Sequence, residues 1–366
     1  MANTTMRAIV AYPKEPGRVE MIDVERPALP AGHVMIAMRD VGTDATDREV
    51  IAAEHGGSAP DGGDYLILGH ESIGQIAEVG EGVTGLNVGD WVVATVRRPD
   101  GCPNCRRGES DMCLWGGYVE RGIIGAHGYL TEYVIEKPEF LVTLPPHLSR
   151  VGALLEPISI NVKAIGQAWS IQRRMLWEPK TALIFGLGSI GILAGMMLRQ
   201  RGIAAYLYSR SPADSPKARL LRDVGITYIA TSDVPDIAAL GDHIGRIDFM
   251  LEATGAAPVA AKAMGIVQPN AVLCLLSVTG GSAREEVDIA AVNKHLVLGN
   301  GVIFGSVNSN AGHFREAVQV LDGFEKTWPG FAERLISRRV PLDRFREGLE
   351  DRDEDIKVLF EVSAAE

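Results

Sequence analysis

The stretch that decides the fold is TALIFGLGSIGILAGMMLRQRG, residues 181–202. It starts with five residues suited to a buried strand, continues through glycines in a GxGxxG spacing, and then shows the apolar periodicity of a helix. The first two glycines permit a tight turn and close backbone approach to a pyrophosphate, and the third lets the helix pack on the strand. A helix N-terminus also offers free N–H groups to phosphates. This context favours a dinucleotide site over a merely structural glycine turn. The predicted cofactor contacts here are Gly186, Gly188, Ser189, Ile190 and Gly191.

Strand-like and helix-like patterns alternate after this turn. Such alternation predicts an α/β fold with a doubly wound parallel sheet. The stretch LVLGNGVIFGSV is expected to form the last strands of that sheet. The expected strands lie at 204–210, 227–231, 249–255, 271–278 and 296–307, and the expected helices at 217–226 and 262–270.

The first 150 residues have a different pattern, with short strand-like runs such as HVMIAMRDVG (33–42) between Gly, Pro and Asp turns. This pattern predicts an irregular all-β body. Residues 153–169 then show helical spacing after a break expected at Pro157. The tail, residues 338–362, returns to mixed strand and helix. The dinucleotide domain is therefore expected to be inserted before the C-terminal portion of the β body.

Composition limits the class of protein. A chain of 366 residues exceeds one ordinary core, which predicts two domains. A net charge of −11 argues against nonspecific nucleic-acid binding. The N-terminal residues lack the apolar core of a secretory signal, and no apolar run reaches the ~18 residues that span a bilayer, so no membrane partner is expected. Three of the four cysteines are clustered, which suits metal ligation in a reducing compartment. We therefore expect a cytoplasmic enzyme.

The end of the second strand predicts which dinucleotide is used. An acidic residue there would bind the ribose 2′-hydroxyl of NAD, but the chain has Ser209, Arg210 and Ser211, with no carboxylate before Asp214. Arg210 can pair with a 2′-phosphate, and the serines can donate to it. The alternative is a solvent-facing arginine on a turn. The sequence favours NADP, with NAD possible.

Polar residues that could hold a divalent cation end several apolar runs. Asp44 lies in VGTDATDREV, His70 and Glu71 in LILGHESIG, and Glu156 in LLEPISI. A metal that polarises an alcohol needs an open position, so three protein ligands are expected from a histidine and carboxylates. A lone histidine after a strand is more often simply hydrogen-bonded. Beside a dinucleotide turn, however, a metal site points to metal-assisted hydride transfer.

Over essentially its full length the chain resembles the zinc-dependent medium-chain dehydrogenase/reductase superfamily, and within it the archaeal and halophilic type of glucose 1-dehydrogenase. The segments that carry the resemblance are DATDREV, LGHESIG, VRRPDGCPNC, ERGIIGAHGYL, LLEPISI, GLGSIG, EATG and GSVNSNAGHF. The resemblance implies a GroES-like catalytic domain at 1–163 and 311–366 and a Rossmann NAD(P)-binding domain at 164–310. It also implies a homodimer or homotetramer.

The resemblance also implies roles for individual residues. The matches of Asp44, His70 and Glu156 hold the catalytic zinc directly or through water, and Glu71 sits beside it. Most of the superfamily has cysteine where this chain has Asp44, an aspartate that halophilic members share. The match of Thr46 touches the reacting oxygen, with Glu71 or Glu156 as a base through water. Those of Glu120 and Asn308 bind sugar hydroxyls, whereas the residues alone would read as a solvated charge and a turn residue.

A cysteine cluster predicts a second, structural zinc. Cys102, Cys105 and Cys113 follow a C-x2-C-x7-C pattern on a Gly/Pro-rich loop. The resembled family carries a further cysteine at the position of Pro99, which cannot ligate. Asp100 is the first expectation for the fourth ligand. The alternative is a loop without zinc that carries reduced thiols.

These observations predict a zinc-dependent aldose (glucose) 1-dehydrogenase that transfers hydride from C1 of the sugar to NADP and gives an aldonolactone. A polyol, alcohol or amino-alcohol dehydrogenase on the same scaffold is the first alternative. A zinc-free reductase of activated double bonds would not need Asp44, His70 and Glu156. A catalytically silent dinucleotide-binding protein would need neither these residues nor Thr46.

Overall fold

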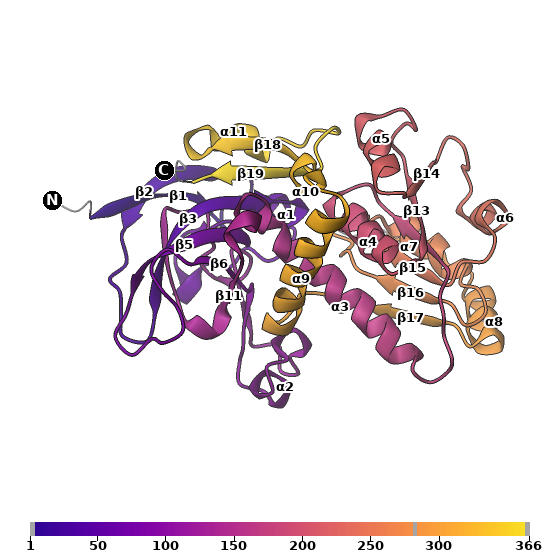
Figure 1. Ribbon diagram of the computed structural model, residues 1–366, viewed down its shortest axis with the longest axis horizontal. Coiled ribbons are helices and arrows are strands. Elements are labelled where there is room, and N and C mark those ends of the chain that lie inside the picture. Colours follow the sequence, from indigo (N-terminus) through magenta and orange to yellow (C-terminus); the bar gives the residue numbers. More distant parts are fainter. Residues whose placement is uncertain (1–3, 281–283, 363–366) are drawn as a thin grey trace. The chain divides into compact units, whose positions relative to one another are not determined.

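The computed structural model describes residues 4–280 and 284–362. The chain divides into two compact units. The first comprises the described parts of residues 1–159 and 308–366, and the second comprises those of 160–307. The boundaries that the resemblance implies, at residues 163 and 310, lie a few residues further along the chain. Figure 1 labels the helices and strands of both units.

The first unit is built mainly of short strands. Its strands are β1 (Thr5–Ala11), β2 (Val19–Glu25), β3 (Val34–Thr43), β4 (Leu66–Ile67), β5 (Glu71–Val79), β6 (Trp91–Ala94), β7 (Arg97–Arg98), β8 (Val119–Arg121), β9 (Gly125–Ala126), β10 (Tyr133–Glu136), β11 (Leu141–Thr143), β18 (Ile336–Pro341) and β19 (Lys357–Glu361). Its helices are α1 (Ala45–Ala52), α2 (Pro103–Arg106), α9 (Ala311–Thr327), α10 (Phe331–Arg334) and α11 (Phe345–Leu349), with the short 3₁₀ helices η1 (Pro60–Gly62), η2 (Ser110–Met112), η3 (Pro138–Phe140), η4 (Pro146–Leu154) and η6 (Leu342–Arg344). The helix α3 (Leu155–Gln172) starts in this unit and ends in the second.

The largest sheet of the first unit has the order β11-β6-β5-β3-β19-β18, with β10 also paired to β3. Figure 1 shows the yellow β19 beside the indigo β3, although more than 300 residues separate them in sequence. Register explains why this sheet carries a site. Gly42 faces Glu71 at the start of β5, and Thr43 faces Val358 at the start of β19. The end of β3 therefore brings the starts of two other strands together.

The second unit is a parallel sheet with helices. Its strands follow the order β14-β13-β12-β15-β16-β17, and each pairing is parallel. The strands are β12 (Thr181–Phe185), β13 (Ala204–Ser209), β14 (Thr227–Ala230), β15 (Phe249–Glu252), β16 (Val272–Leu275) and β17 (Val302–Gly305). The helices are α4 (Ser189–Gln200), α5 (Pro216–Asp223), α6 (Leu240–Ile244), α7 (Ala257–Gly265) and α8 (Ile289–Gly299), with the 3₁₀ helix η5 (Ile237–Ala239).

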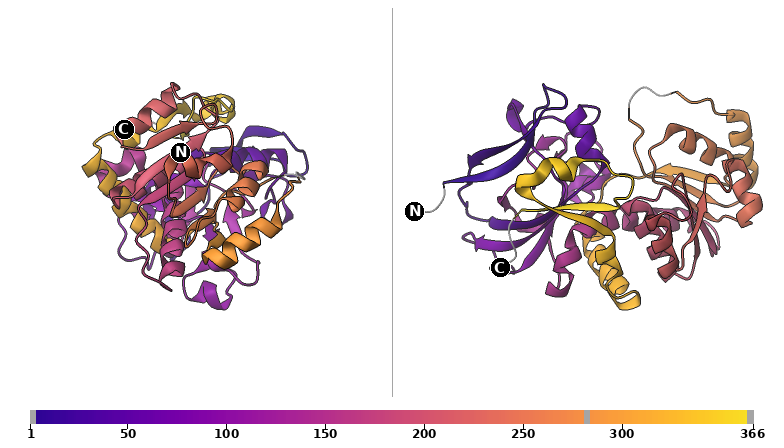
Figure 2. Two further views of the ribbon diagram at one scale, coloured as in Figure 1. Left: turned by 90° about the vertical axis from the view of Figure 1, so that its right-hand side faces the viewer. Right: turned by 90° about the horizontal axis from the view of Figure 1, so that it is seen from above.

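Helices cover both faces of this sheet (Figure 2). Leu183 and Phe185 of β12 pack in a buried cluster with Ala263 of α7. Ile184, which points the other way on the same strand, lies against Gly195 of α4. Because side chains alternate across a strand, α4 and α7 lie on opposite faces. This is the doubly wound arrangement that the sequence predicts, with the strand order reversing beside β12.

Two local predictions were wrong. The expected break at Pro157 does not occur, because α3 starts at Leu155 and Pro157 falls in its first turn, where its missing N–H costs nothing. Residues 296–299 of the expected last strands are helical and end α8, and only Val302–Gly305 form a strand. A short apolar run suits a helix and a strand equally well, so its period could not decide between them.

Candidate active site

Asp44 is placed by the turn from β3 into α1. It is the N-cap of α1, and its Oδ1 accepts a hydrogen bond from the Thr46 N–H at 2.7 Å. The Asp47 side chain accepts from the Asp44 N–H at 3.1 Å, which completes a reciprocal capping box. Oδ2 of Asp44 then points to His70, with 3.8 Å between Oδ2 and Nε2. The local rules of helix capping thus fix the first candidate ligand.

His70 and Glu71 follow a glycine that no other residue could replace without strain. Gly69 has φ +87°, and a Cβ there would collide with Val41 and Leu130. Its N–H donates to Oδ1 of Asp47 at 3.2 Å, so the same aspartate ties α1 to this loop. Both side chains that follow are buried. This loop therefore carries its two polar side chains into the first unit's interior.

Glu71 has a partner that the sequence analysis missed. Lys357 Nζ lies 2.6 Å from both carboxylate oxygens of Glu71, and each side chain is only 1% exposed. A Cβ at Gly42, which faces Glu71 across the sheet, would overlap the carboxylate. The lone lysine in the otherwise apolar run KVLF was the available signal. Glu71 is thus held by Lys357 and by the absence of a side chain at position 42.

Glu156 lies in the first turn of α3 and is buried. Ser159 Oγ, one turn on, pairs with the Glu156 carbonyl oxygen and with Ser309 Oγ, each at 2.6 Å. One oxygen of Glu156 and one of Glu71 lie within 4.8 Å of each other and of a His70 ring nitrogen. The same distance joins His70 to Asp44 and Asp47. His70 is the member that the two groups share.

The electrostatics of this cluster suit a cation. Burial raises the pKa of Asp47 and Glu71, and that of Glu156 to about 8. Burial opposes a charged imidazole, but the carboxylates of Asp44 and Asp47 outweigh it and raise the pKa of His70 to about 9. The metal-free cluster therefore retains protons at neutral pH, because Lys357 alone cannot balance so many buried carboxylates. A divalent ion would balance the charge in their place, so the residues fit a metal.

Thr46 lies beside this cluster. It is half-buried in α1, and its Oγ1 lies 3.4 Å from Oδ2 of Asp44. A hydroxyl can donate and accept at once, which suits a group that passes a proton onward.

Glu120 and Asn308 meet, as candidates for one site should. Nδ2 of Asn308 donates to Oε1 of Glu120 at 2.6 Å across 188 residues of sequence. Asn308 has φ +59°, in the left-handed region, and its Oδ1 accepts from the Ser309 N–H at 2.7 Å. The expectation that Glu120 alone would be a solvated charge does not describe it, since Glu120 is buried. The Arg97 guanidinium is its ion-pair partner, which sequence reasoning missed.

His127 has a structural environment. Its Nδ1 accepts from the Ile67 N–H at 3.2 Å, and its ring stacks on Tyr65 with centroids 5.3 Å apart.

The cysteine loop brings together Asp100 and the three predicted cysteines, with one ligand atom of each within 4.8 Å of the others. Backbone N–H groups point at the sulfurs: that of Leu114 donates to Cys102 Sγ and that of Gly116 to Cys113 Sγ, each at 3.3 Å. Although burial opposes a thiolate, the N–H groups of Leu114 and Cys105 lower the pKa of Cys102 to about 7. Cys113 Sγ also lies 3.0 Å from an Asp100 carboxylate oxygen. The loop thus has the donor set of a closed tetrahedral site.

The dinucleotide turn lies in the second unit, between β12 and α4. Gly186 has φ +114°, and a Cβ on Gly191 would overlap the Gly186 carbonyl oxygen. Gly188 is the N-cap of α4, and no side chain of the described residues caps the N–H groups that follow it, at Ser189 and Ile190. These groups are available to a phosphate.

The end of β13 presents the residues expected to select the cofactor. Ser209 and Ser211 are half-buried, and Arg210 is exposed. Tyr228 Oη donates to the carbonyl oxygens of Ser209, at 3.2 Å, and of Ser211, at 2.5 Å. The hydroxyl holds the backbone on both sides of Arg210, so the guanidinium projects from a fixed turn.

A parallel-sheet dinucleotide unit and a β-rich unit with a buried histidine–carboxylate cluster together define a metal-dependent dinucleotide dehydrogenase. Comparison with known proteins agrees. The family profile described as glucose dehydrogenase C-terminus matches residues 149–362, and that of the alcohol dehydrogenase GroES-like domain matches residues 30–146.

Relatives match over nearly the whole chain. The glucose 1-dehydrogenase of Methanocella arvoryzae is 42% identical, covering 98% of this chain and 100% of its own length. That of Vulcanisaeta moutnovskia is 36% identical, covering 98% and 99%. A solved structure of Haloferax mediterranei glucose dehydrogenase with NADP, zinc and gluconolactone has a TM-score of 0.90 at 35% identity, covering 98% and 100%.

The chain therefore belongs to the glucose dehydrogenase family of the zinc-dependent medium-chain dehydrogenases. The predicted fold class, the family and the kind of reaction, an NAD(P)-dependent zinc oxidoreductase acting on CH–OH groups, are confirmed. Every helix in the described residues is too short or too polar to cross a bilayer.

Proposed function

We propose that this protein oxidises an aldose, glucose or a close epimer, at C1 with NADP and releases the aldonolactone. The observation that carries the proposal is the buried cluster around His70, whose charge calls for a cation. Family membership and the polar pair Glu120–Asn308, which suits a polyol, support it.

We assign the catalytic zinc to Asp44, His70 and Glu156. Glu71 lies beside these residues and is paired with Lys357. Bound there, zinc would supply a Lewis acid that lowers the pKa of the C1 hydroxyl. The proton from that hydroxyl can pass to Thr46 Oγ1. It can also pass through water to Glu71 or Glu156, whose carboxylates can act as a base.

The proposal places NADP on the second unit. The pyrophosphate would lie at the N-terminus of α4, at Gly186–Gly191, and the 2′-phosphate beside Ser209, Arg210 and Ser211. Arg210→Ala should weaken use of NADP much more than use of NAD, because the 2′-phosphate alone loses its partner. Equal losses with both cofactors would reject this role for Arg210.

The cysteine loop is proposed to hold a structural zinc through Cys102, Cys105, Cys113 and Asp100. The N–H groups directed at the sulfurs and the position of Asp100 support a metal over free thiols.

We also propose a homodimer or homotetramer in the cytoplasm. The strand β17 lies at the edge of its sheet, and the neighbouring α8 exposes Ile289, Val297 and Leu298. Such an edge and such apolar side chains are usually covered by a partner. The four cysteines are free, which suits a reducing compartment.

The test is an activity panel of aldoses, polyols, simple secondary alcohols and amino alcohols with NADP and NAD, run before and after chelation and zinc return. We expect aldose oxidation with NADP that chelation abolishes and zinc restores. Asp44→Ala should remove activity and the chelatable ion while NADP binding stays nearly intact. Faster turnover of a simple alcohol than of every aldose, or full activity without metal, would overturn the proposal.

A further inference from the structure

Arg97 and Glu120 form a buried ion pair. They are cross-strand neighbours in the antiparallel pair of β7 and β8. Their side chains are 5% and 10% exposed, and the distances from Nε and Nη2 of Arg97 to Oε1 of Glu120 are 3.0 and 2.9 Å. A buried arginine is costly unless it is paired, so the pair fixes both side chains.

The contacts on the Glu120 carboxylate are one-sided. Oε1 receives both nitrogens of Arg97 and Nδ2 of Asn308. Within residues 4–280 and 284–362, no hydrogen bond reaches Oε2. A carboxylate oxygen can accept two hydrogen bonds. The arrangement therefore saturates one oxygen and leaves the other able to accept hydroxyl groups.

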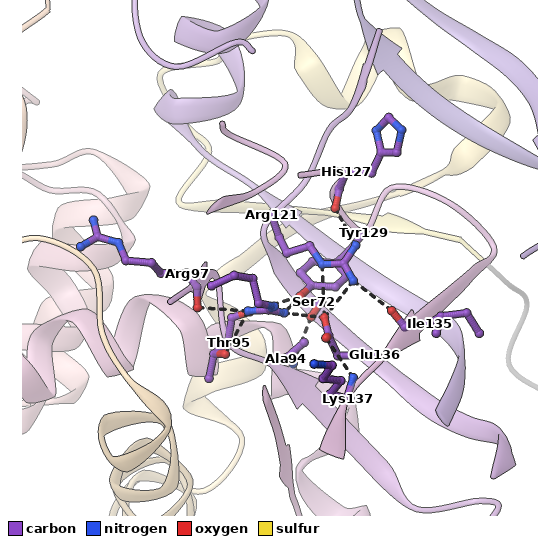
Figure 3. Close-up of polar contacts among 11 residues, drawn as sticks. Ser72, Ala94, Thr95, Arg97, Arg121, His127, Tyr129, Ile135, Glu136 and Lys137 are labelled. Carbon is purple, nitrogen blue, oxygen red and sulfur yellow. Dashed lines mark hydrogen bonds and ion pairs between the residues drawn. The ribbon is translucent and has the colours of Figure 1, made fainter. Parts of the chain in front are cut away.

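The remaining nitrogen of Arg97 anchors it elsewhere. Nη1 donates to the carbonyl oxygens of Ser110, at 3.4 Å, and Asp111, at 3.3 Å, which belong to the cysteine loop. The guanidinium also stacks over the Tyr118 ring, 3.7 Å from its centroid. Figure 3 shows the Arg97 side chain extending away from the polar cluster around Glu136, with only its carbonyl oxygen turned toward that cluster. Arg97 is therefore dedicated to Glu120 and the loop.

The same loop also contacts the segment that follows Asn308. The Asp111 carboxylate accepts from Nδ2 of Asn310 at 2.7 Å, and Asn310 is the N-cap of α9. Asn308 lies two residues before it. The segment that carries Ser110 and Asp111 thus contacts Arg97, the partner of Glu120, and Asn310, two residues after Asn308.

We propose that Arg97 is a positioning residue for sugar recognition. It pins Oε1 of Glu120 to the cysteine loop, so that Oε2 is presented to the hydroxyls of the aldose. This inference rests on the proposed function. It predicts that Arg97 governs affinity for polyhydroxy substrates and not the oxidation step, because a simple alcohol has no neighbouring hydroxyl for Oε2 to receive.

Arg97→Met and Arg97→Lys test the inference, with Arg98→Met as a matched control. Arg98 is the neighbouring arginine, with a side chain 13% exposed, and it pairs with Glu136 and Tyr129 on the opposite side of the strand. Lysine keeps the charge but cannot contact Glu120 with two nitrogens and the loop with a third. Glu120→Gln is included as a reference for the sugar site. Each variant is assayed for KM and kcat with an aldose and with a small secondary alcohol, for aldonolactone binding by calorimetry with NADP present, and for thermal midpoint.

For Arg97→Met we expect aldose KM and the aldonolactone dissociation constant to rise about tenfold to a hundredfold, the range of one charged hydrogen bond. The kcat/KM for the small alcohol should change little. For Arg97→Lys, the aldose KM and the aldonolactone dissociation constant should lie between those of the native protein and Arg97→Met. Arg98→Met should lower the thermal midpoint without changing the ratio of aldose to alcohol kcat/KM. If Arg97→Met does not fold, the ratio of aldose to alcohol kcat/KM measured for Arg97→Lys tests the inference.

Failure of this inference can be separated from failure of the proposed function. One outcome would show that Arg97 is only structural and that the inference is wrong. In that outcome Glu120→Gln raises aldose KM, but both Arg97 variants, like Arg98→Met, leave the ratio of aldose to alcohol kcat/KM unchanged. If Glu120→Gln leaves aldose KM unchanged, or the native enzyme oxidises no aldose, the sugar site itself is misassigned.

Discussion

Replacing Lys357 by methionine should destabilise the metal-free protein strongly. The change removes the partner of Glu71 at a place where both side chains are 1% exposed, so the carboxylate stays buried without its cation. Removing one member of a buried pair costs about 3–5 kcal/mol. For a domain of this size such a loss lowers the thermal midpoint by roughly 6–20 °C.

Lys357 is charged at neutral pH, so the stabilities of the native protein and of Lys357→Met can be compared there. Burial opposes its charge, but Glu71 and Asp44 outweigh burial and raise the pKa of Lys357 above its usual 10.5. A raised pKa in the folded state means that the stabilising contribution is complete below that value and declines as the pH rises past it. Thermal unfolding at pH 7 therefore measures the full effect.

Zinc should reverse much of this loss. Lys357 and a bound cation repel each other, and both attract Asp44, Glu71 and Glu156. Without the lysine, the Glu71 carboxylate is free to contact the metal ion instead. We expect zinc affinity, measured by competition with a chelator, to rise about tenfold or more, which corresponds to ~1.4 kcal/mol of relieved repulsion. The midpoint shift on adding zinc should also exceed that of the native protein.

Two controls make the reasoning refutable. Lys163→Met removes another buried lysine, whose Nζ donates to the Val307 carbonyl oxygen in the second unit, and should leave zinc affinity unchanged. The double variant Lys357→Met/Glu71→Met should recover most of the lost stability, because replacing both members of a buried pair is often neutral. A single variant as stable as the native protein, or a double variant no better than the single, would show that the pair is not the cause.

Three further outcomes are expected. Glu136→Gln should lower the thermal midpoint at pH 7 and reduce the loss of stability that the native protein shows on acidification below pH 4.5. Burial opposes the charge of Glu136, but Arg121 and Arg98 outweigh burial and lower its pKa. The carboxylate therefore stabilises the fold above pH 4.5, and this stabilisation is lost as the pH falls through the lowered pKa. Unfolding scans from pH 7 to pH 3 check this, and equal slopes for both proteins would contradict it. Cys105→Ser should remove about one zinc per chain in metal analysis of dialysed protein, and unchanged zinc content would argue against a metal in the cysteine loop. Zinc affinity of the metal-free protein should increase from pH 6.5 to 9, because the ion displaces the proton that the carboxylates hold on His70; chelator competition that shows no pH dependence would reject this.

The polar cluster around Glu136 shows why some of the architecture was beyond sequence reasoning. Arg98 and Arg121 come from separate segments and meet at the Glu136 carboxylate, and the Tyr129 hydroxyl accepts a hydrogen bond from Arg98 (Figure 3). In the sequence each looks like an ordinary surface residue. Their convergence follows from how the strands of the first unit pack, and no local pattern carries that information.

The parts of this protein whose chemistry is local could be predicted from the amino-acid sequence. The GxGxxG turn and the closely spaced cysteines each act through neighbours within a few positions, so their spacing predicts their geometry. Helix and strand periods also separated the β-rich body from the parallel-sheet unit. They failed at Pro157 and at residues 296–299, where the first turn of a helix tolerates proline and a short apolar run has no distinctive period.

Which residues surround the cluster of Asp44, His70, Glu71 and Glu156 could be seen only in the folded protein. The sequence left Glu71 and Glu156 as competing groups beside Asp44 and His70. The structure shows Glu71 paired through both oxygens with Lys357, 286 positions away, because β5 and β19 both start beside the end of β3. In the same way Arg97 meets Glu120 across a sheet pair. Strand register sets such contacts, and register depends on packing across the whole sheet.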